Sequence, residues 1–167
     1  MPDPQDYILA ACTEADLDAV MEIERLSFPA PWERQAFAEE LMRPWARLRL
    51  LREAASVSAV AFCNYWLVAD ELHILNIAVH PRARRHGHAS RILRHILAEA
   101  RELHVQRLSL EVRVSNQAAQ ALYRKFGFRE VGTRPRYYAN NGEDALLMDL
   151  DFGQAEETPI AARDPSP

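Results

Sequence analysis

Cysteine is scarce in this sequence, which has only Cys12 and Cys63 among its 167 residues. The two cysteines form no C-x-x-C pair and belong to no cluster of metal-ligand residues, so we expect small, apolar, reduced side chains and no metal site. Reduced cysteines are typical of a reducing compartment and favour a cytoplasmic location.

The sequence also lacks a long apolar run and the residue pattern of a leader peptide. Its longest apolar run, residues 59–69, is interrupted by Asn64 and is far shorter than the ~20 residues that a helix needs to span a bilayer. The N-terminus, Met-Pro-Asp-Pro-Gln-Asp, has neither the basic nor the apolar region of a signal peptide. We therefore expect neither secretion nor a membrane partner.

An excess of positive charge is absent as well. The 20 Lys and Arg residues against 24 Asp and Glu residues give a net charge of -4, so no direct binding to nucleic acid is expected. A hydrophobic content of 49% and a charged content of 26% match a soluble globular protein. The length fits one domain, which we place at residues 1–152. Residues 153–167 are rich in Pro, Glu and Asp without an apolar period, which predicts a disordered tail.

Local patterns predict a mixed sheet with helices on its faces. Thr13 and Asp16 resemble a capping box at the start of the first helix. Residues 73–79 are almost continuously apolar, which predicts a central strand covered on both faces. The predicted elements, in order, are a helix after Thr13, a short helix ending before Pro44, antiparallel strands at 46–52 and 56–69, a strand at 73–79, a helix at 88–104, a strand at 108–114, a helix opening at Ser115-Asn116 and ending at Gly127, and a terminal hairpin around residues 140–142.

The segment Arg84 to Ala89, Arg-Arg-His-Gly-His-Ala, lies between the predicted central strand and the strongest predicted helix. A helix N-terminus offers unpaired amides and about half a positive charge, which suits a phosphate. Gly87 and Ala89 are small enough for the backbone to approach a phosphate oxygen. The alternative is a solvated basic loop that also includes Arg82. Neither a G-x-G-x-x-G motif nor a Walker loop is present.

The strand Ile74 to Pro81 followed by Arg84 to Ala89 resembles motif A of the GNAT acetyltransferases, whose pattern is Q/R-x-x-G-x-G/A. The resemblance implies an α/β (α+β mixed) GNAT fold, with a mostly antiparallel sheet splayed at the cofactor strand. It also implies acetyl-CoA as co-substrate. The residues that it implies for cofactor binding are Ile77, Ala78, Val79, Arg84, Arg85, His86, Gly87, His88 and Ala89. Ile77 and Val79 are also compatible with simple core packing, because their side chains can pack while their peptides bind.

Further segments resemble the RimI-type protein N-terminal acetyltransferases within this family. They are Leu110–Asn116, Ala121–Phe128, Arg136-Tyr137-Tyr138 and Glu143-Asp144-Ala145. Phe28 to Trp32 is similar to that branch's Phe-Pro-Trp element, with two extra residues. The resemblance covers roughly residues 7 to 150. It implies as partner and acceptor the N-terminal alanine of a small-subunit ribosomal protein, the eighteenth in the usual naming. We expect a monomer or weak dimer.

The RimI-type resemblance also implies residue roles: Glu111 as general base, Tyr123 as general acid and Asn116 as a cofactor contact. We expect desolvation in mid-strand to raise the pKa of Glu111 toward neutrality. The alternatives are a Glu111 paired with Arg113 or facing solvent at a sheet edge, and an ordinary core tyrosine at Tyr123.

The acceptor side is less defined. Trp32, Tyr137 and Tyr138 are candidate substrate-binding residues, although the two tyrosines could equally be hairpin aromatics. At pH about 7.5 roughly a third of α-amines are neutral, against about one lysine in a thousand, which favours a peptide N-terminus as nucleophile. Two other functions stay open: acetylation of a small-molecule amine such as a polyamine or an aminoglycoside, and a CoA-binding sensor module without turnover.

Overall fold

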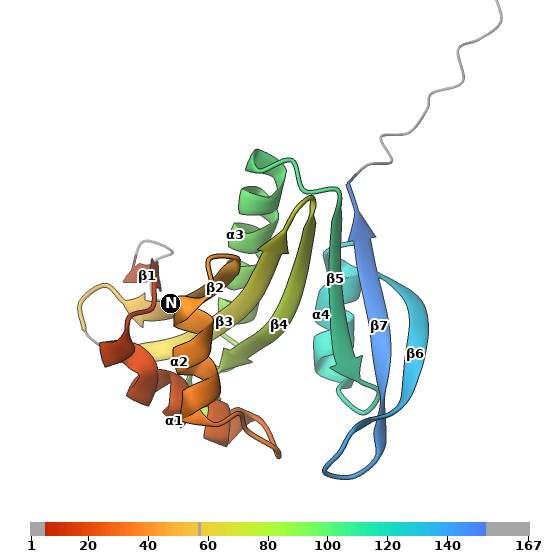
Figure 1. The fold of residues 1–167 in the computed structure, drawn as a ribbon. Helices are drawn as coiled ribbons and strands as arrows, with labels where there is room; N and C mark the ends of the chain where they lie inside the picture. The colour runs from red at the N-terminus through yellow and green to blue at the C-terminus, as the bar shows by residue number, and fades with distance from the viewer. Residues whose placement is uncertain (1–5, 57, 153–167) are drawn as a thin grey trace, which may run out of the picture.

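A single twisted sheet organises the chain, and the computed structural model describes residues 6–56 and 58–152. The strands follow the order β1-β2-β3-β4-β5-β7-β6, and only β4 and β5 run parallel (Figure 1). The strands are β1 (Tyr7–Ala11), β2 (Ala46–Glu53), β3 (Ala59–Val68), β4 (Glu71–Val79), β5 (Arg107–Arg113), β6 (Arg129–Tyr138) and β7 (Glu143–Asp151). The predicted α/β fold with a mostly antiparallel sheet is confirmed. The tail predicted at residues 153–167 lies outside the described residues.

Helices cover both faces of this sheet (Figure 1). The helices are α1 (Leu17–Ser27), α2 (Arg34–Met42), α3 (His88–Glu102) and α4 (Gln117–Lys125), with short 3₁₀ turns η2 (Glu14–Asp16) and η3 (Pro81–Ala83). One core cluster, which includes Phe37 and Phe62, packs under α1 and α2. The other includes Ile92 and Tyr123 and packs under α3 and α4. None of the helices in the described part of the chain is long and apolar enough to cross a membrane.

The predicted helix boundaries are confirmed by their capping contacts. The Thr13 amide donates to the Asp16 carboxylate at 2.8 Å, as expected for a capping box. At the end of α4, Gly127 has φ +95° and its amide donates to the Arg124 carbonyl at 3.0 Å. A left-handed residue after the last turn is the geometry that glycine adopts without a Cβ penalty.

Strands β4 and β5 separate part-way along their length. Their parallel pairing runs from Glu71 with Arg107 to Ile74 with Leu110, and no pairing follows. The predicted splay at the cofactor strand is therefore confirmed. The central position of β4 is also confirmed, but its residues alternate between buried and half-exposed, so its cover on both faces is incomplete.

Leu75 is an extra residue in β4, because Ile74 pairs with Tyr65 of β3 while Asn76 pairs with Asn64. Such a bulge reverses the alternation of side chains between the two faces. It follows that His73, before the bulge, and Asn76, after it, point to the same face of the sheet.

Candidate active site

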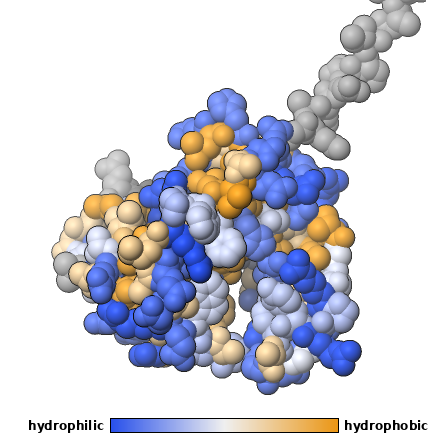
Figure 2. All heavy atoms as spheres, in the orientation of Figure 1, coloured by the Kyte–Doolittle hydropathy of each residue, from blue (hydrophilic) through white to orange (hydrophobic). Residues whose placement is uncertain are grey.

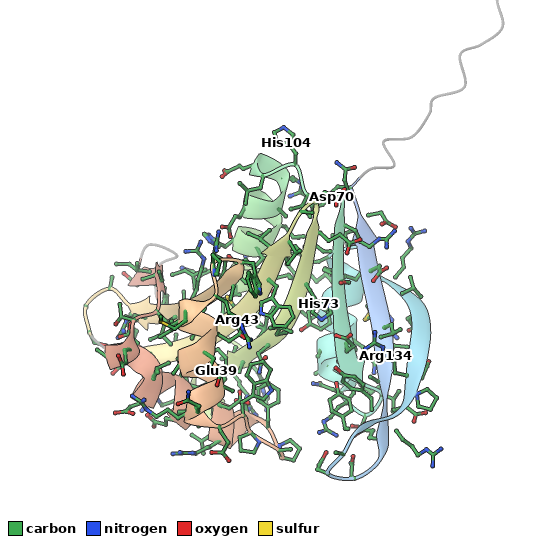
Figure 3. All side chains as sticks on the ribbon, in the orientation of Figure 1. Glu39, Arg43, Asp70, His73, His104 and Arg134 are labelled. Atoms are coloured by element: carbon green, nitrogen blue, oxygen red, sulfur yellow. The ribbon has the colours of Figure 1, made fainter. Side chains whose placement is uncertain are left out.

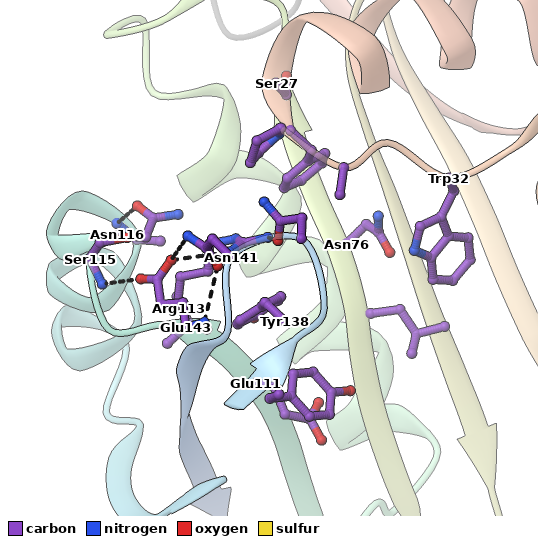
Figure 4. Close-up of a pocket in the computed structure, with 18 of the residues that line it drawn as sticks. Ser27, Trp32, Asn76, Glu111, Arg113, Ser115, Asn116, Tyr138, Asn141 and Glu143 are labelled. Atoms are coloured by element: carbon purple, nitrogen blue, oxygen red, sulfur yellow. Dashed lines mark hydrogen bonds and ion pairs between the residues drawn. The ribbon is translucent and has the colours of Figure 1, made fainter. Parts of the chain in front are cut away.

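A cleft of about 850 Å³ opens where β4 and β5 part. The space-filling view shows a hollow between the half of the sheet that ends at β4 and the half that begins at β5 (Figure 2). The lining comes from the loop between α1 and α2, from β4 and β5, from the start of α4, and from the turn between β6 and β7. Figure 4 shows Trp32 and Asn76 on one side, with Arg113 and Glu143 on the other.

Glu111 is the first residue of β5 beyond the paired stretch, and it lines the cleft. Its side chain is 14% exposed. One carboxylate oxygen, Oε2, lies 2.8 Å from Nε2 of His73, and the other, Oε1, lies 3.5 Å from the guanidinium of Arg134. Arg113 instead contacts Glu143 at 3.0 Å. The alternative of a Glu111–Arg113 pair is thus not observed, and β5 is not an edge strand.

The expected upward shift of the Glu111 pKa is wrong. Burial by itself would raise this pKa, but the hydrogen bond and charge of His73, followed by the charge of Arg134, outweigh it and lower the pKa below its ordinary value. Desolvation can be expected from a place in mid-strand, but the two side chains that the sheet brings to the carboxylate, His73 and Arg134, cannot be read from the local sequence.

Tyr123 of α4 lines the same cleft and also belongs to the core. It is 8% exposed, and its ring centroid lies 5.7 Å from that of Phe128. Burial raises the pKa of Tyr123, and the neighbouring Tyr138 adds to this effect. The phenol therefore stays protonated at neutral pH. Core packing and a place at the cleft, which the sequence analysis treated as alternatives, coexist here.

The loop from Arg84 to Gly87 leads into the N-terminus of α3, and the side chains of its three charged or titratable residues are exposed. Gly87 has φ +77°, and a Cβ placed there would meet no protein atom within 4 Å. The space over Gly87 is therefore open to a ligand. Ala89, the second small position of the motif, lies in the first turn of the helix and is half-buried.

The two histidines of this loop differ in their surroundings. His86 is exposed, whereas His88 is 3% exposed and its ring lies 4.5 Å from that of Tyr7. Burial lowers the pKa of His88, with Arg91 and His86 adding to the effect. The His88 imidazole is thus part of the interior, so only its backbone is placed to face a cofactor.

Backbone amides of β4 point into the split. The His80 amide donates to Val60 of β3 at 2.8 Å. Since amides along a strand point alternately to either side, the amide of Ala78 also faces β3, while those of Ile77 and Val79 face away from it, toward the gap. The Val79 carbonyl, which accepts from Arg84 Nε at 3.2 Å, agrees with this direction. Of the three β4 residues predicted to contact the cofactor, only Ala78 has an amide that faces β3 instead of the gap.

Arg113 organises the end of the cleft formed by the β6–β7 turn. Its guanidinium donates to Glu143 and to the Asn140 and Asn141 side chains, and it lies 3.8 Å from the ring of Tyr138. Burial raises the pKa of Tyr138 to about 12. Tyr137 also lines the cleft and is 46% exposed.

Asn116, at the start of α4, accepts a hydrogen bond from the Ala119 amide at 3.1 Å and caps the helix. It lines the cleft as well. Its prediction as a cofactor contact is thus compatible with a structural task for the same side chain.

Two cleft residues escaped the sequence analysis on the side of α1. Glu24 is 1% exposed, and its Oε1 accepts from the Trp32 amide at 2.9 Å. Burial raises the pKa of Glu24, although the Trp32 amide and Asn76 partly offset this. Glu24 Oε2 and Asn76 Oδ1 are buried without a hydrogen-bond partner among the described residues. Glu24 interrupts the apolar face of α1, and Asn76 interrupts the apolar run of β4. A polar residue at such a position is a sequence signal for a functional site.

The sequence of this chain matches the Acetyltransferase (GNAT) family over residues 17–128. The chain belongs to the GNAT acetyltransferase family. It is 41% identical over 134 residues to a putative ribosomal protein bS18-alanine N-acetyltransferase of Bacillus subtilis, which covers 80% of this chain and 87% of the relative. It is also 35% identical over 155 residues to the N-alpha-acetyltransferase RimI of Mycobacterium tuberculosis, covering 90% of this chain and 96% of the relative.

A solved GNAT structure agrees with these relatives. The crystal structure of the ribosomal-protein-S18-alanine N-acetyltransferase from Escherichia coli superposes with a TM-score of 0.81 at 33% identity, covering 91% of this chain and 97% of that one. The predicted membership of the GNAT family and similarity to its RimI-type branch are both confirmed. The roles of individual site residues in this GNAT protein stay predictions.

Proposed function

We propose that this GNAT protein transfers the acetyl group of acetyl-CoA to the N-terminal α-amine of a protein, and that the acceptor is the N-terminal alanine of ribosomal protein bS18. One observation carries the proposal: Glu111 and Tyr123 line a single cleft at the split of the sheet. The names of the relatives from Bacillus subtilis and Escherichia coli support the choice of acceptor.

The cofactor side of the site suits a phosphorylated thioester. The amides around Gly87, at the N-terminus of α3, are placed to bind the pyrophosphate of acetyl-CoA. The amides of Ile77 and Val79 point into the split, where they bind the pantetheine arm and orient the thioester. This path follows β4 from the loop toward the cleft.

The reaction moves one acetyl group and one proton. The α-amine attacks the thioester carbon, a C–N bond forms, and the attacking nitrogen becomes positively charged. Glu111, held ionised by its neighbours, accepts a proton from this nitrogen. The C–S bond then breaks, and Tyr123 donates a proton to the departing thiolate. The lowered pKa keeps Glu111 ionised but makes it a weaker base, so it accepts the proton only from the positively charged nitrogen, which is far more acidic than a neutral amine.

The acceptor peptide enters from the side of the cleft opposite the cofactor loop. Trp32 at the α1–α2 loop and Tyr137 and Tyr138 at the end of β6 line the cleft, and we assign them to the acceptor peptide. The proposal keeps the predicted monomer or weak dimer. The proposal includes a cytoplasmic location, because ribosomal proteins are made there.

The test is incubation of the protein and acetyl-CoA with peptides that begin with Ala, Ser or Met and with one N-blocked lysine peptide. Thiol release gives the rate, and mass spectrometry locates the acetyl group. We expect acetylation of free N-termini, fastest for the bS18 peptide. Activity confined to polyamines or aminoglycosides would overturn the protein acceptor, and acetyl-CoA binding without turnover on any amine would indicate a sensor module.

A further inference from the structure

A chain of three polar side chains crosses from β4 to β5 at the base of the split. His73 lies beside Ser109 in the parallel register, and its Nδ1 is 2.8 Å from the Ser109 hydroxyl. Its Nε2 is 2.8 Å from Oε2 of Glu111. His73 thus contacts β5 on both sides of the last paired residue, Leu110. Figure 3 places His73 where β4 and β5 begin to diverge.

The contact with the Ser109 hydroxyl bears on which ring nitrogen of His73 carries the proton. If the hydroxyl donates to Nδ1, the proton of the neutral ring is on Nε2, directed at Glu111. A ring held at both nitrogens has a fixed orientation, as in metal sites where a hydrogen bond to the free ring nitrogen orients a histidine ligand. The side chain of His73 is 30% exposed and that of Glu111 is 14% exposed, so the contact is partly shielded from water.

The other groups around the pair come from β6 and β7. Arg134 of β6 approaches the second oxygen of Glu111 at 3.5 Å with a side chain that is 56% exposed. Tyr138 of β6 interacts electrostatically with Glu111, and Asp149 of β7 does so with His73. The 3.5 Å between Arg134 and Oε1 exceeds the usual hydrogen-bond length of about 3.2 Å, and the Arg134 side chain is largely solvated. His73 therefore makes the shorter and better shielded contact with the carboxylate.

We propose that His73 is a positioning residue for Glu111: its Nε2–H holds Oε2 in place and leaves Oε1 directed to the attacking amine. This inference rests on the proposed function, since it assigns His73 to the proton-accepting step of that reaction. The β4 bulge at Leu75 contributes by turning His73 and Asn76 to the same face, along which the cleft runs. His73 neither accepts nor donates the transferred proton in this role, because it acts only by holding Glu111.

Two substitutions separate positioning from packing. His73→Leu keeps an apolar volume but removes the donor, whereas His73→Gln places an uncharged amide donor near the position of Nε2. We expect His73→Leu to lower kcat at least about tenfold, because small displacements of a reacting group cost this much or more. The KM for acetyl-CoA is expected to stay within about twofold, since the cofactor path does not include His73. His73→Gln is expected to recover most of kcat.

The pH profile gives a readout that a purely structural role would not change. Loss of the His73 contact raises the pKa of Glu111, so the acid limb of kcat/KM is expected to move to higher pH in His73→Leu. Glu71→Gln is the matched control, because Glu71 lies two residues earlier on the same strand with a side chain that is 62% exposed. It is expected to leave both kcat and the limb unchanged.

A measurement independent of turnover completes the test. With ¹³C-labelled glutamate, the side-chain carboxyl resonance of Glu111 is identified by its loss in Glu111→Gln and titrated in the wild type and in both His73 variants. An upward move of this titration in His73→Leu is expected. Unchanged titration and unchanged kcat in a folded His73→Leu would overturn the positioning role, even if the wild type acetylates peptides. Absence of peptide acetylation by the wild type would instead overturn the proposed function, and the titration would still decide the pairing.

Discussion

Glu24 of α1 and Glu111 of β5 line the same cleft, yet their surroundings move their carboxyl pKa values in opposite directions. Glu24 is buried and keeps one oxygen without a partner among the described residues, and its pKa is raised. Glu111 is also largely buried, but His73 and Arg134 lower its pKa. Glu111 therefore keeps its negative charge to a lower pH than Glu24 does.

The first prediction compares the two carboxylates directly. Glu111→Gln is expected to lower kcat by about 10²-fold or more, the usual contribution of a positioned base, with acetyl-CoA affinity unchanged by calorimetry. Glu24→Gln retains an oxygen for the Trp32 amide, so its effect is expected mainly in the KM for the peptide. The reverse result, with kcat lost in Glu24→Gln and retained in Glu111→Gln, would transfer the role of base to Glu24.

The second prediction concerns pH. A base with a lowered pKa loses its charge only when the pH falls through that lowered value, so the acid limb due to Glu111 lies below the ordinary glutamate range. Between pH 6 and 9 we expect kcat/KM to rise as the peptide α-ammonium loses its proton and becomes the neutral amine, with a pKa of about 7.7–8.0. A steady-state profile with an Ala-initiated peptide checks this. A limb near pH 6 that is the same for peptides of different α-amine pKa would contradict it.

The order of elements was predictable because each carries a local signal. Apolar residues three and four positions apart predicted α3, and alternating apolar and polar residues predicted β5. Gly127 predicted the end of α4. Strand β1 escaped prediction because its five residues become a strand only by pairing with β2. The point at which β4 and β5 separate is a matter of tertiary register, so the resemblance to a family could imply it but no local pattern could place it.

The site was predictable to the level of single residues and not of their neighbours. Glu111 and Tyr123 followed from the resemblance and do share a cleft. The partner of Glu111, however, lies 38 positions earlier at His73, and Arg134 reaches it from β6, so nothing in the local sequence announces either contact. The wrong direction given for the Glu111 pKa has this single cause.

The third prediction tests the phosphate-binding loop at Gly87. Gly87→Val is expected to weaken CoA binding about tenfold or more, because backbone hydrogen bonds to phosphate of ~1.5–3 kcal/mol each depend on close approach. The same change also strains a backbone at φ +77°. Gly142→Val is the matched control, since Gly142 has φ +70° and equally open space but lies in the β6–β7 turn. Gly142→Val is expected to lower the melting temperature as Gly87→Val does, but to bind CoA as the wild type does. Equal CoA affinity in the two variants would show that the Gly87 loop is not part of the binding site.

The fourth prediction removes only the hydroxyl of Tyr123. Tyr123→Phe keeps the ring that packs against Phe128, so the melting temperature is expected to change little. Without a proton donor for the thiolate, kcat is expected to fall by about 10–10²-fold, toward the lower end of general acid contributions, while acetyl-CoA affinity is retained. Because burial raises the pKa of Tyr123, the wild type is expected to show no loss of activity from its ionisation up to pH 9. Stopped assays with mass detection at pH 6, 7.5 and 9 give all three rates. A Phe variant with full kcat at each pH would show that Tyr123 serves the core alone, and the thiolate would then take its proton from water.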